Sequence, residues 1–168
     1  MGCDIHAFIE KREPQSSSYS RSIHFPINRD YFLFGLLAGV RYSKCEYIQP
    51  RGLPLDINWF TREQYEEMQM DAHTPSWLTL PELEAIIPKL EEGREADKKE
   101  FGDFVSGMGE LFEDDSELTE TGRENLAQLL IEEKEKPDRF YWFLATVNCM
   151  RFAEANGLKT RLVFWFDN

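Results

Sequence analysis

Two Asp-x-His pairs hold the side chains of this sequence that are best suited to chemistry. Asp4 and His6 stand two residues apart near the start, and Asp71 and His73 repeat that spacing further along the chain. In an extended strand, residues i and i+2 point to the same side, so such a pair presents a carboxylate beside an imidazole. This combination serves metal binding and proton transfer, although an ordinary polar strand face or a loop cap also produces it.

Together the two pairs would supply two imidazoles and two carboxylates to one site. Such a set can hold a divalent metal ion, either Zn²⁺, Mn²⁺ or Mg²⁺, and leave a coordination position open for a water that becomes a nucleophile. We therefore predict Asp4, His6, Asp71 and His73 as metal ligands, and Asp4, His6 and His73 as catalytic residues. The prediction requires the two imidazoles to lie within about 10 Å of each other, because metal–nitrogen bonds are only about 2 Å long.

Four further residues are candidates for substrate binding. Arg51 lies in the turn Pro50-Arg-Gly-Leu-Pro54, where two prolines stiffen the backbone. A guanidinium held in this way suits a phosphate or a carboxylate, and an ordinary ion pair with one of the many acids is the alternative. Trp59 and Trp77 offer rings that can stack on a nucleotide base. Asp167 follows an apolar run and lies either at the mouth of a site or at a solvated chain end.

The elements that must position these residues form an α+β pattern. Alternating apolar residues predict a strand over 2–10, and the unbroken apolar run within 161–168 predicts a strand that is buried on both sides. Residues 71–77 are typical of a loop. Capping residues and the helical spacing of apolar side chains predict helices at 30–41, 62–69, from 79 with a break at Pro88, from 121, and at 138–155. We expect a small mixed sheet that includes both terminal strands and is covered by about five helices.

Composition and charge limit the classes of function. The chain has 168 residues, of which 42% are hydrophobic, so we expect one domain over 1–168 with a substantial core. The net charge is −12, and residues 81–136 alone hold 18 acidic side chains against 7 basic ones. This balance argues against binding to double-stranded nucleic acid, which needs a basic face. The acidic region is either a set of solvated helix faces or a surface that docks on a basic partner.

The sequence predicts neither a membrane protein nor a secreted one. No apolar run reaches the ~18 to 20 residues that span a bilayer, and the first residues lack the pattern of a secretory signal. The three cysteines stand far apart and fit a reducing compartment. We therefore expect a cytoplasmic protein that does not interact with a membrane.

Several stretches of the sequence together carry a resemblance to known proteins. They are Met-Gly-Cys-Asp-Ile-His at the start, 28–41, Arg-Gly-Leu-Pro with Asp56, Asp71-x-His73 with 76–80, and the closing Arg-Leu-Val-Phe-Trp-Phe-Asp-Asn. These stretches resemble a group of small phage and prophage proteins. The resemblance covers both ends and the first half of the chain, without the acidic 81–136 region. It implies a phage-encoded protein that acts in the bacterial cytoplasm, and it implies no particular reaction.

The observations favour two functions, and a structural or assembly role in a phage is neither supported nor excluded. The first is a nucleotide-handling protein, which either hydrolyses a phosphoester with the help of a metal or binds a nucleotide without turnover. Its ligands would be host nucleotides, defence signals or other phosphate-bearing small molecules. The second is an acidic inhibitor that docks on a basic face of a host protein and has no catalytic role.

Overall fold

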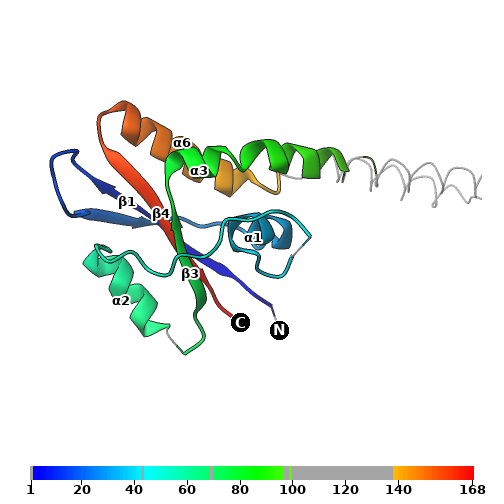
Figure 1. Cartoon of the computed structure of the whole chain (residues 1–168), viewed down its shortest axis with the longest axis horizontal. Coiled ribbons are helices and arrows are strands. Elements are labelled where there is room, and N and C mark those ends of the chain that lie inside the picture. The colour runs from blue at the N-terminus through cyan, green and yellow to red at the C-terminus, as the bar shows by residue number, and fades with distance from the viewer. Residues whose placement is uncertain (1, 43, 69, 97–98, 100–137) are drawn as a thin grey trace, which may run out of the picture. The chain divides into compact units, whose positions relative to one another are not determined.

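The computed structural model describes residues 2–42, 44–68, 70–96, 99 and 138–168 (Figure 1). The chain divides into two compact units, 1–88 with 140–168, and 89–139. In the second unit, residues 89–96 are helical and the Arg94 guanidinium donates to Asp138. The helix predicted from 121, with most of the acidic 81–136 region, lies outside the described residues. Among the described helices, none has both the length and the apolar character needed to cross a membrane.

The first unit is built on a four-stranded sheet with strand order β2-β1-β4-β3. The strands are β1 (Ile5–Arg12), β2 (Arg21–His24), β3 (His73–Leu78) and β4 (Lys159–Phe166). Both terminal strands are in the sheet, which confirms the predicted α+β fold. We expected a mixed sheet, whereas all three pairings are antiparallel. A short hairpin joins β1 to β2, a connection that only antiparallel neighbours can use.

The interior position of β4 is also confirmed. Residues 160–166 are all buried, and β4 pairs with β1 on one side and with β3 on the other. A strand that is covered on both faces needs no polar alternation, which explains the apolar run from Leu162 to Phe166.

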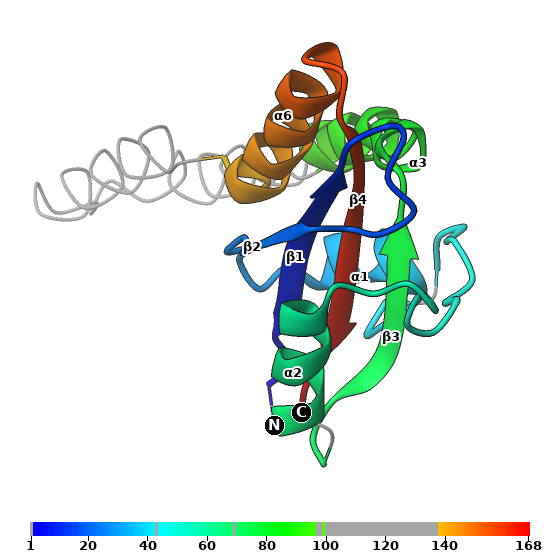
Figure 2. The same cartoon turned by 90° about the vertical axis from the view of Figure 1, so that its left-hand side faces the viewer.

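The pairing of β1 with β4 sorts their side chains onto two faces. We call them the α6 face, which carries Ile5, Ala7 and Ile9 beside Phe166, Phe164 and Leu162, and the α2 face, which carries His6, Phe8 and Glu10 beside Trp165, Val163 and Arg161. Helices α1 (Tyr31–Ala38), α3 (Leu80–Glu84) and α6 (Tyr141–Ala155) pack on the first face, and α2 (Trp59–Glu67) packs on the second (Figure 2). Phe34 of α1 meets Phe166 at 5.1 Å, and Tyr65 of α2 meets Trp165 at 5.3 Å between ring centroids.

Helix α1 begins where the sequence predicts and ends three residues earlier than the predicted 41. The Asp30 carboxylate accepts a hydrogen bond from the Leu33 N–H, and Gly39 ends the helix in the left-handed conformation. Gly35 allows close packing, because a side chain there would lie 2.5 Å from the Tyr42 carbonyl oxygen.

Two segments differ from the sequence prediction. Helix α2 begins three residues earlier than expected, because Asn58 rather than Thr61 caps it by accepting from the Phe60 N–H. The segment predicted as a loop forms the edge strand β3. Its pairing is irregular between His73 and Ser76, and this irregularity is what allows Pro75 to lie in a strand.

Candidate functional site

The best-formed acid–base pair joins the two ends of the chain. Because β1 and β4 are antiparallel neighbours, the start of one lies beside the end of the other, and the termini lie side by side in both views (Figures 1 and 2). His6 Nε2 lies 3.0 Å from Asp167 Oδ2. The Asp4 N–H donates to Asp167 Oδ1 at 2.9 Å, and the Asp167 N–H donates back to the Asp4 carbonyl oxygen at 3.2 Å. The backbone of β1 therefore fixes the carboxylate that holds His6.

The environment of Asp167 determines which ring nitrogen of His6 carries the proton. Burial raises the pKa of Asp167, but the hydrogen bonds from the His6 ring and from the Asp4 N–H outweigh it and hold the pKa below its usual value. An ionised carboxylate can only accept, so Nε2 of His6 carries a hydrogen. In the part of the chain that the structure describes, Nδ1 has no hydrogen-bond partner.

His6 is held in place and remains accessible. Its ring stacks on Trp165 with a centroid distance of 5.8 Å and an interplanar angle of 16°. The side chains of His6 and Asp167 are 26% and 25% exposed. An oriented imidazole with one unengaged nitrogen and partial access to solvent is the arrangement that a general base requires.

Asp4 has a different role from the one its spacing suggested. Both of its carboxylate oxygens accept from the Arg29 guanidinium, at 2.8 and 2.6 Å. These hydrogen bonds hold the pKa of Asp4 below its usual value. The carboxylate that orients His6 therefore comes from Asp167, and Asp4 contributes through its backbone.

His73 lies on the opposite face of the sheet from His6. His6 is opposite Trp165 in the β1–β4 pairing and His73 is opposite Phe166 in the β3–β4 pairing, and consecutive residues of β4 point to opposite faces. His73 accordingly stacks on Phe166, at 6.0 Å between ring centroids. Asp71 lies exposed in the turn before β3. The structure therefore does not bring the two Asp-x-His pairs together, and within residues 2–96 and 138–168, gaps excepted, no group of three or more acidic, His or Cys side chains could hold a metal ion.

His73 belongs to a second polar cluster on the α6 face. Its Nε2 lies 3.9 Å from the Cys3 sulfur, and its Nδ1 lies 2.9 Å from the Thr74 hydroxyl. Thr74 and Arg41 both have positive φ angles, 50° and 61°, which cost energy in residues other than glycine. Burial raises the pKa of the Cys3 thiol although Arg41 lowers it, so Cys3 is unsuited to act as a nucleophile.

Arg51 and Trp77 serve the fold in this structure. The Arg51 guanidinium pairs with both carboxylate oxygens of Glu82, one of them at 3.1 Å, and lies 4.9 Å from the centre of the Trp77 ring. Hydrogen bonds from Arg51 lower the pKa of Glu82 to about 2. Trp59 is 71% exposed and meets Phe60 edge-on, so it belongs to the surface of α2.

A buried ion pair that sequence reasoning missed links the two central strands. Arg161 on β4 is 4% exposed and Glu10 on β1 is fully buried, and they are opposite each other in the pairing. Arg161 donates to Glu10 at 2.8 Å and to Asp56 at 2.6 Å, and its guanidinium lies 3.7 Å from the centre of the Tyr19 ring. In the sequence, the only sign of this ion pair was an acidic residue on one terminal strand and a basic residue on the other. Such charges do not show which residues of the two strands lie opposite each other.

Comparison of the chain with protein-family models, with curated proteins and with solved structures finds no match. The resemblance to small phage proteins therefore stays a prediction, and the function must be argued from the site itself.

Proposed function

We propose that the protein binds a phosphate-bearing small molecule where the ends of β1 and β4 meet, and that His6 transfers the proton in hydrolysis of its phosphoester bond. A nucleotide is the ligand class that the sequence favours. The observation that carries the proposal is the 3.0 Å contact between His6 Nε2 and Asp167 Oδ2, made by an imidazole that remains partly exposed.

The chemistry follows from the two ring nitrogens. Asp167 engages the N–H of Nε2, so the neutral ring offers the lone pair of Nδ1 to an attacking water. As the water oxygen bonds to phosphorus, Nδ1 takes its proton, and the ester oxygen departs with a proton from the imidazolium or from solvent. The carboxylate of Asp167 stabilises the positive ring that forms meanwhile. General base catalysis of this kind contributes roughly 10²- to 10⁴-fold in rate.

A cation that contacts Asn168 at the end of β4 supports an anionic ligand. Arg41 donates to the side-chain oxygen of Asn168 at 2.7 Å, one residue beyond Asp167. An amide oxygen carries no charge, so a phosphate can replace it on the guanidinium with a gain in charge-assisted hydrogen bonding. In this proposal Arg41 contacts the phosphate, and Arg51 as a substrate-binding residue stays a prediction.

The setting is proposed from the resemblance to phage proteins. It favours the bacterial cytoplasm, with host nucleotides or defence signals as ligands. If the bound nucleotide is not turned over, the same residues would serve to sequester it. A divalent metal ion stays a prediction, and the experiment below includes it as a variable.

Hydrolysis of bis(p-nitrophenyl) phosphate and p-nitrophenyl phosphate tests the proposal. We expect the wild-type protein to release p-nitrophenol in EDTA or with added Zn²⁺, Mn²⁺ or Mg²⁺, and His6→Gln to lower the rate by about 10²-fold. His24→Gln is the comparison variant, because His24 contacts Phe8 rather than Asp167 and interacts with His6 only through its charge, so we expect it to change the rate by less than about 3-fold.

Equal rates in wild type and His6→Gln would contradict catalysis. Binding of AMP without turnover, measured by calorimetry and weakened in His6→Gln, would support sequestration. If the protein neither hydrolyses the substrates nor binds AMP, an acidic inhibitor of a host protein becomes the better explanation. In that case the protein should capture a basic host protein in a salt-sensitive way, and His6→Gln should not affect the capture.

A further inference from the structure

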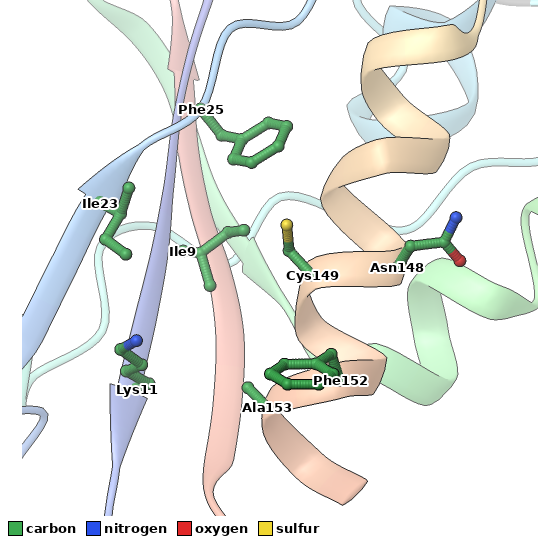
Figure 3. A pocket seen from close by; sticks show the side chains of 8 residues that line it. All are labelled: Ile9, Lys11, Ile23, Phe25, Asn148, Cys149, Phe152 and Ala153. Carbon is green, nitrogen blue, oxygen red and sulfur yellow. The ribbon is translucent and has the colours of Figure 1, made fainter. Parts of the chain in front are cut away.

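An apolar groove lies between the β1–β2 hairpin and α6, at the far end of β1 from His6. Its volume is about 410 Å³, within the range of small-molecule pockets. Figure 3 shows the side chains of Ile9 and Ile23 on the strands facing those of Cys149 and Phe152 on the helix. Phe25 closes one end of the groove and Lys11 stands near the other.

The groove exposes apolar surface that the described residues do not cover. Phe152 is 74% exposed and Ile23 is 49% exposed, and both line the groove. Isolated exposed apolar residues are common, but several gathered around one concave surface mark a binding site.

A group of basic side chains stands at the Lys11 end. Lys11 is opposite Arg21 in the β1–β2 pairing, and both belong to the α6 face with Ile9 and Ile23, whereas Arg12 and Lys159 belong to the α2 face. Lys11, Arg12 and Arg21 also line a small polar pocket of about 100 Å³, which shares Lys11 with the groove. Glu13 is the acid among the residues of that pocket.

These charges are largely unengaged. Arg12 donates to the backbone carbonyl oxygens of Pro14 and Ser16. Lys11, Arg21 and Lys159 make no ion pair with any residue that the structure describes. Two basic side chains on one face, Lys11 and Arg21, that make no ion pair with a described residue are unexpected in a chain whose net charge is −12. Placed at the end of an apolar groove, they complement a ligand that is apolar along its length and anionic at one end.

We propose that this groove binds a free small amphiphile, an acyl chain that ends in a carboxylate or a phosphate. The chain lies between Ile23 and Phe152, and the anionic group lies on Lys11 and Arg21. A bounded groove of this volume suits one such molecule better than a membrane surface, which would require a flat or protruding apolar face. The site is independent of the proposed reaction at His6, because the two lie at opposite ends of β1.

The proposal is tested by whether a bound ligand slows the reaction of Cys149 with N-ethylmaleimide. A second cysteine of the same protein provides the reference. Cys149 is exposed and lines the groove, whereas Cys45 lies in the segment after α1 and serves as the internal reference. Decanoate and decyl phosphate are the probes, and mass spectrometry of the peptides reports each thiol. With saturating probe, we expect the labelling rate of Cys149 to fall about 5-fold or more while that of Cys45 is unchanged, because labelling follows the unoccupied fraction.

The charged end of the site is tested by substitution. Lys11→Gln and Arg21→Gln should each raise the decanoate concentration needed for half protection by about 10-fold, since each removes a charge-assisted contact. Lys44→Gln, which removes an exposed lysine outside the groove, should have no effect.

Three results would overturn the proposal. The first is that neither probe protects Cys149. The second is that decanol protects Cys149 as well as decanoate does, both in wild type and in Lys11→Gln. The third is that anionic phospholipid vesicles protect Cys149 and the free probes do not. The last result would assign this surface to a membrane.

Discussion

His6 takes its orientation from a residue at the other end of the sequence. A carboxylate two positions away along a strand points to the same side, but Asp4 is drawn outward by the bidentate pair with Arg29. Asp167 reaches His6 because β1 and β4 run antiparallel and end together. The pair therefore depends on the register of the two terminal strands, which is held along eight residue pairs.

Substitution of the two aspartates by asparagine separates their roles. Asp167→Asn should lower the rate of phosphoester hydrolysis by about 10-fold or more, because an amide can present an N–H to Nε2 and favour the wrong ring tautomer. Asp4→Asn should leave the rate within about 3-fold, since Asp4 acts through its backbone N–H. A larger loss in Asp4→Asn than in Asp167→Asn would show that Asp4 is the residue that acts on His6.

The three cysteines should differ widely in reactivity. Cys149 is exposed, Cys45 is partly buried and Cys3 is buried with a raised pKa. We expect N-ethylmaleimide to modify Cys149 first and Cys3 about 100-fold more slowly, because Cys3 reacts only after local opening. Peptide mass spectrometry over time measures the order, and rapid modification of Cys3 would mean that the end of the sheet opens readily.

At the scale of elements, the contact between β1 and β4 contains the strongest buried electrostatic interaction. Arg161→Met should destabilise the protein by about 3–5 kcal/mol, because Glu10 then remains buried without its cationic partner. The double variant Glu10→Gln, Arg161→Met should recover about 1–2 kcal/mol of that loss, since a neutral amide still accepts from the Asn58 N–H. Urea denaturation of wild type, Arg161→Met, Glu10→Gln and the double variant measures the four stabilities, and additive losses would show that the two charges are not coupled.

The contact of Arg51 with α3 predicts a pH dependence of stability. Because the pKa of Glu82 is lowered to about 2, its ion pair stabilises the folded state above about pH 4.5, and this contribution is lost as pH falls from about 4.5 through about 2. Both side chains are about one-third exposed, so solvent screening reduces the contribution to roughly 1–2 kcal/mol.

Glu82→Gln should flatten the loss of stability in this pH range, while keeping an acceptor for the Thr79 N–H at the start of α3. Arg51→Gln should flatten it less, because the hydrogen bonds from the Thr79 N–H and hydroxyl still lower the pKa of Glu82, and adding Arg51→Gln to Glu82→Gln should change nothing further. Thermal unfolding from pH 5 to pH 2 measures the effect. Curves of equal slope in wild type and both variants would contradict it.

At the scale of the whole molecule, local patterns predicted more of the fold than of the site. The Asp30 cap of α1 and the apolar run of β4 depend on neighbouring residues, so they could be read directly from the sequence. The helix that begins at 80 breaks at 85–86 and helical structure resumes at 87, because Pro88 offers no N–H and fits only a first turn. The strand character of 73–78 was missed because Pro75 is typical of a loop.

The site could not be predicted in the same way, since it depends on contacts between distant residues. The Asp-x-His spacing correctly placed Asp4 and His6 near each other, but the face on which His73 lies depends on the register of β3 against β4. Asp167 was singled out for its position after a buried strand, and only the pairing of the termini shows that it contacts His6. Nothing in the sequence indicated the positive φ angles of Arg41 and Thr74.

The measurement that tests the central claim most directly is a long-range ¹H–¹⁵N NMR spectrum of the histidine rings, recorded during titration with AMP. We predict that neutral His6 carries its hydrogen on Nε2, that its Nδ1 resonance shifts in a saturable way as AMP is added, and that His24 does not respond. A hydrogen on Nδ1 of His6, or a His6 ring that does not respond to AMP, would contradict the account.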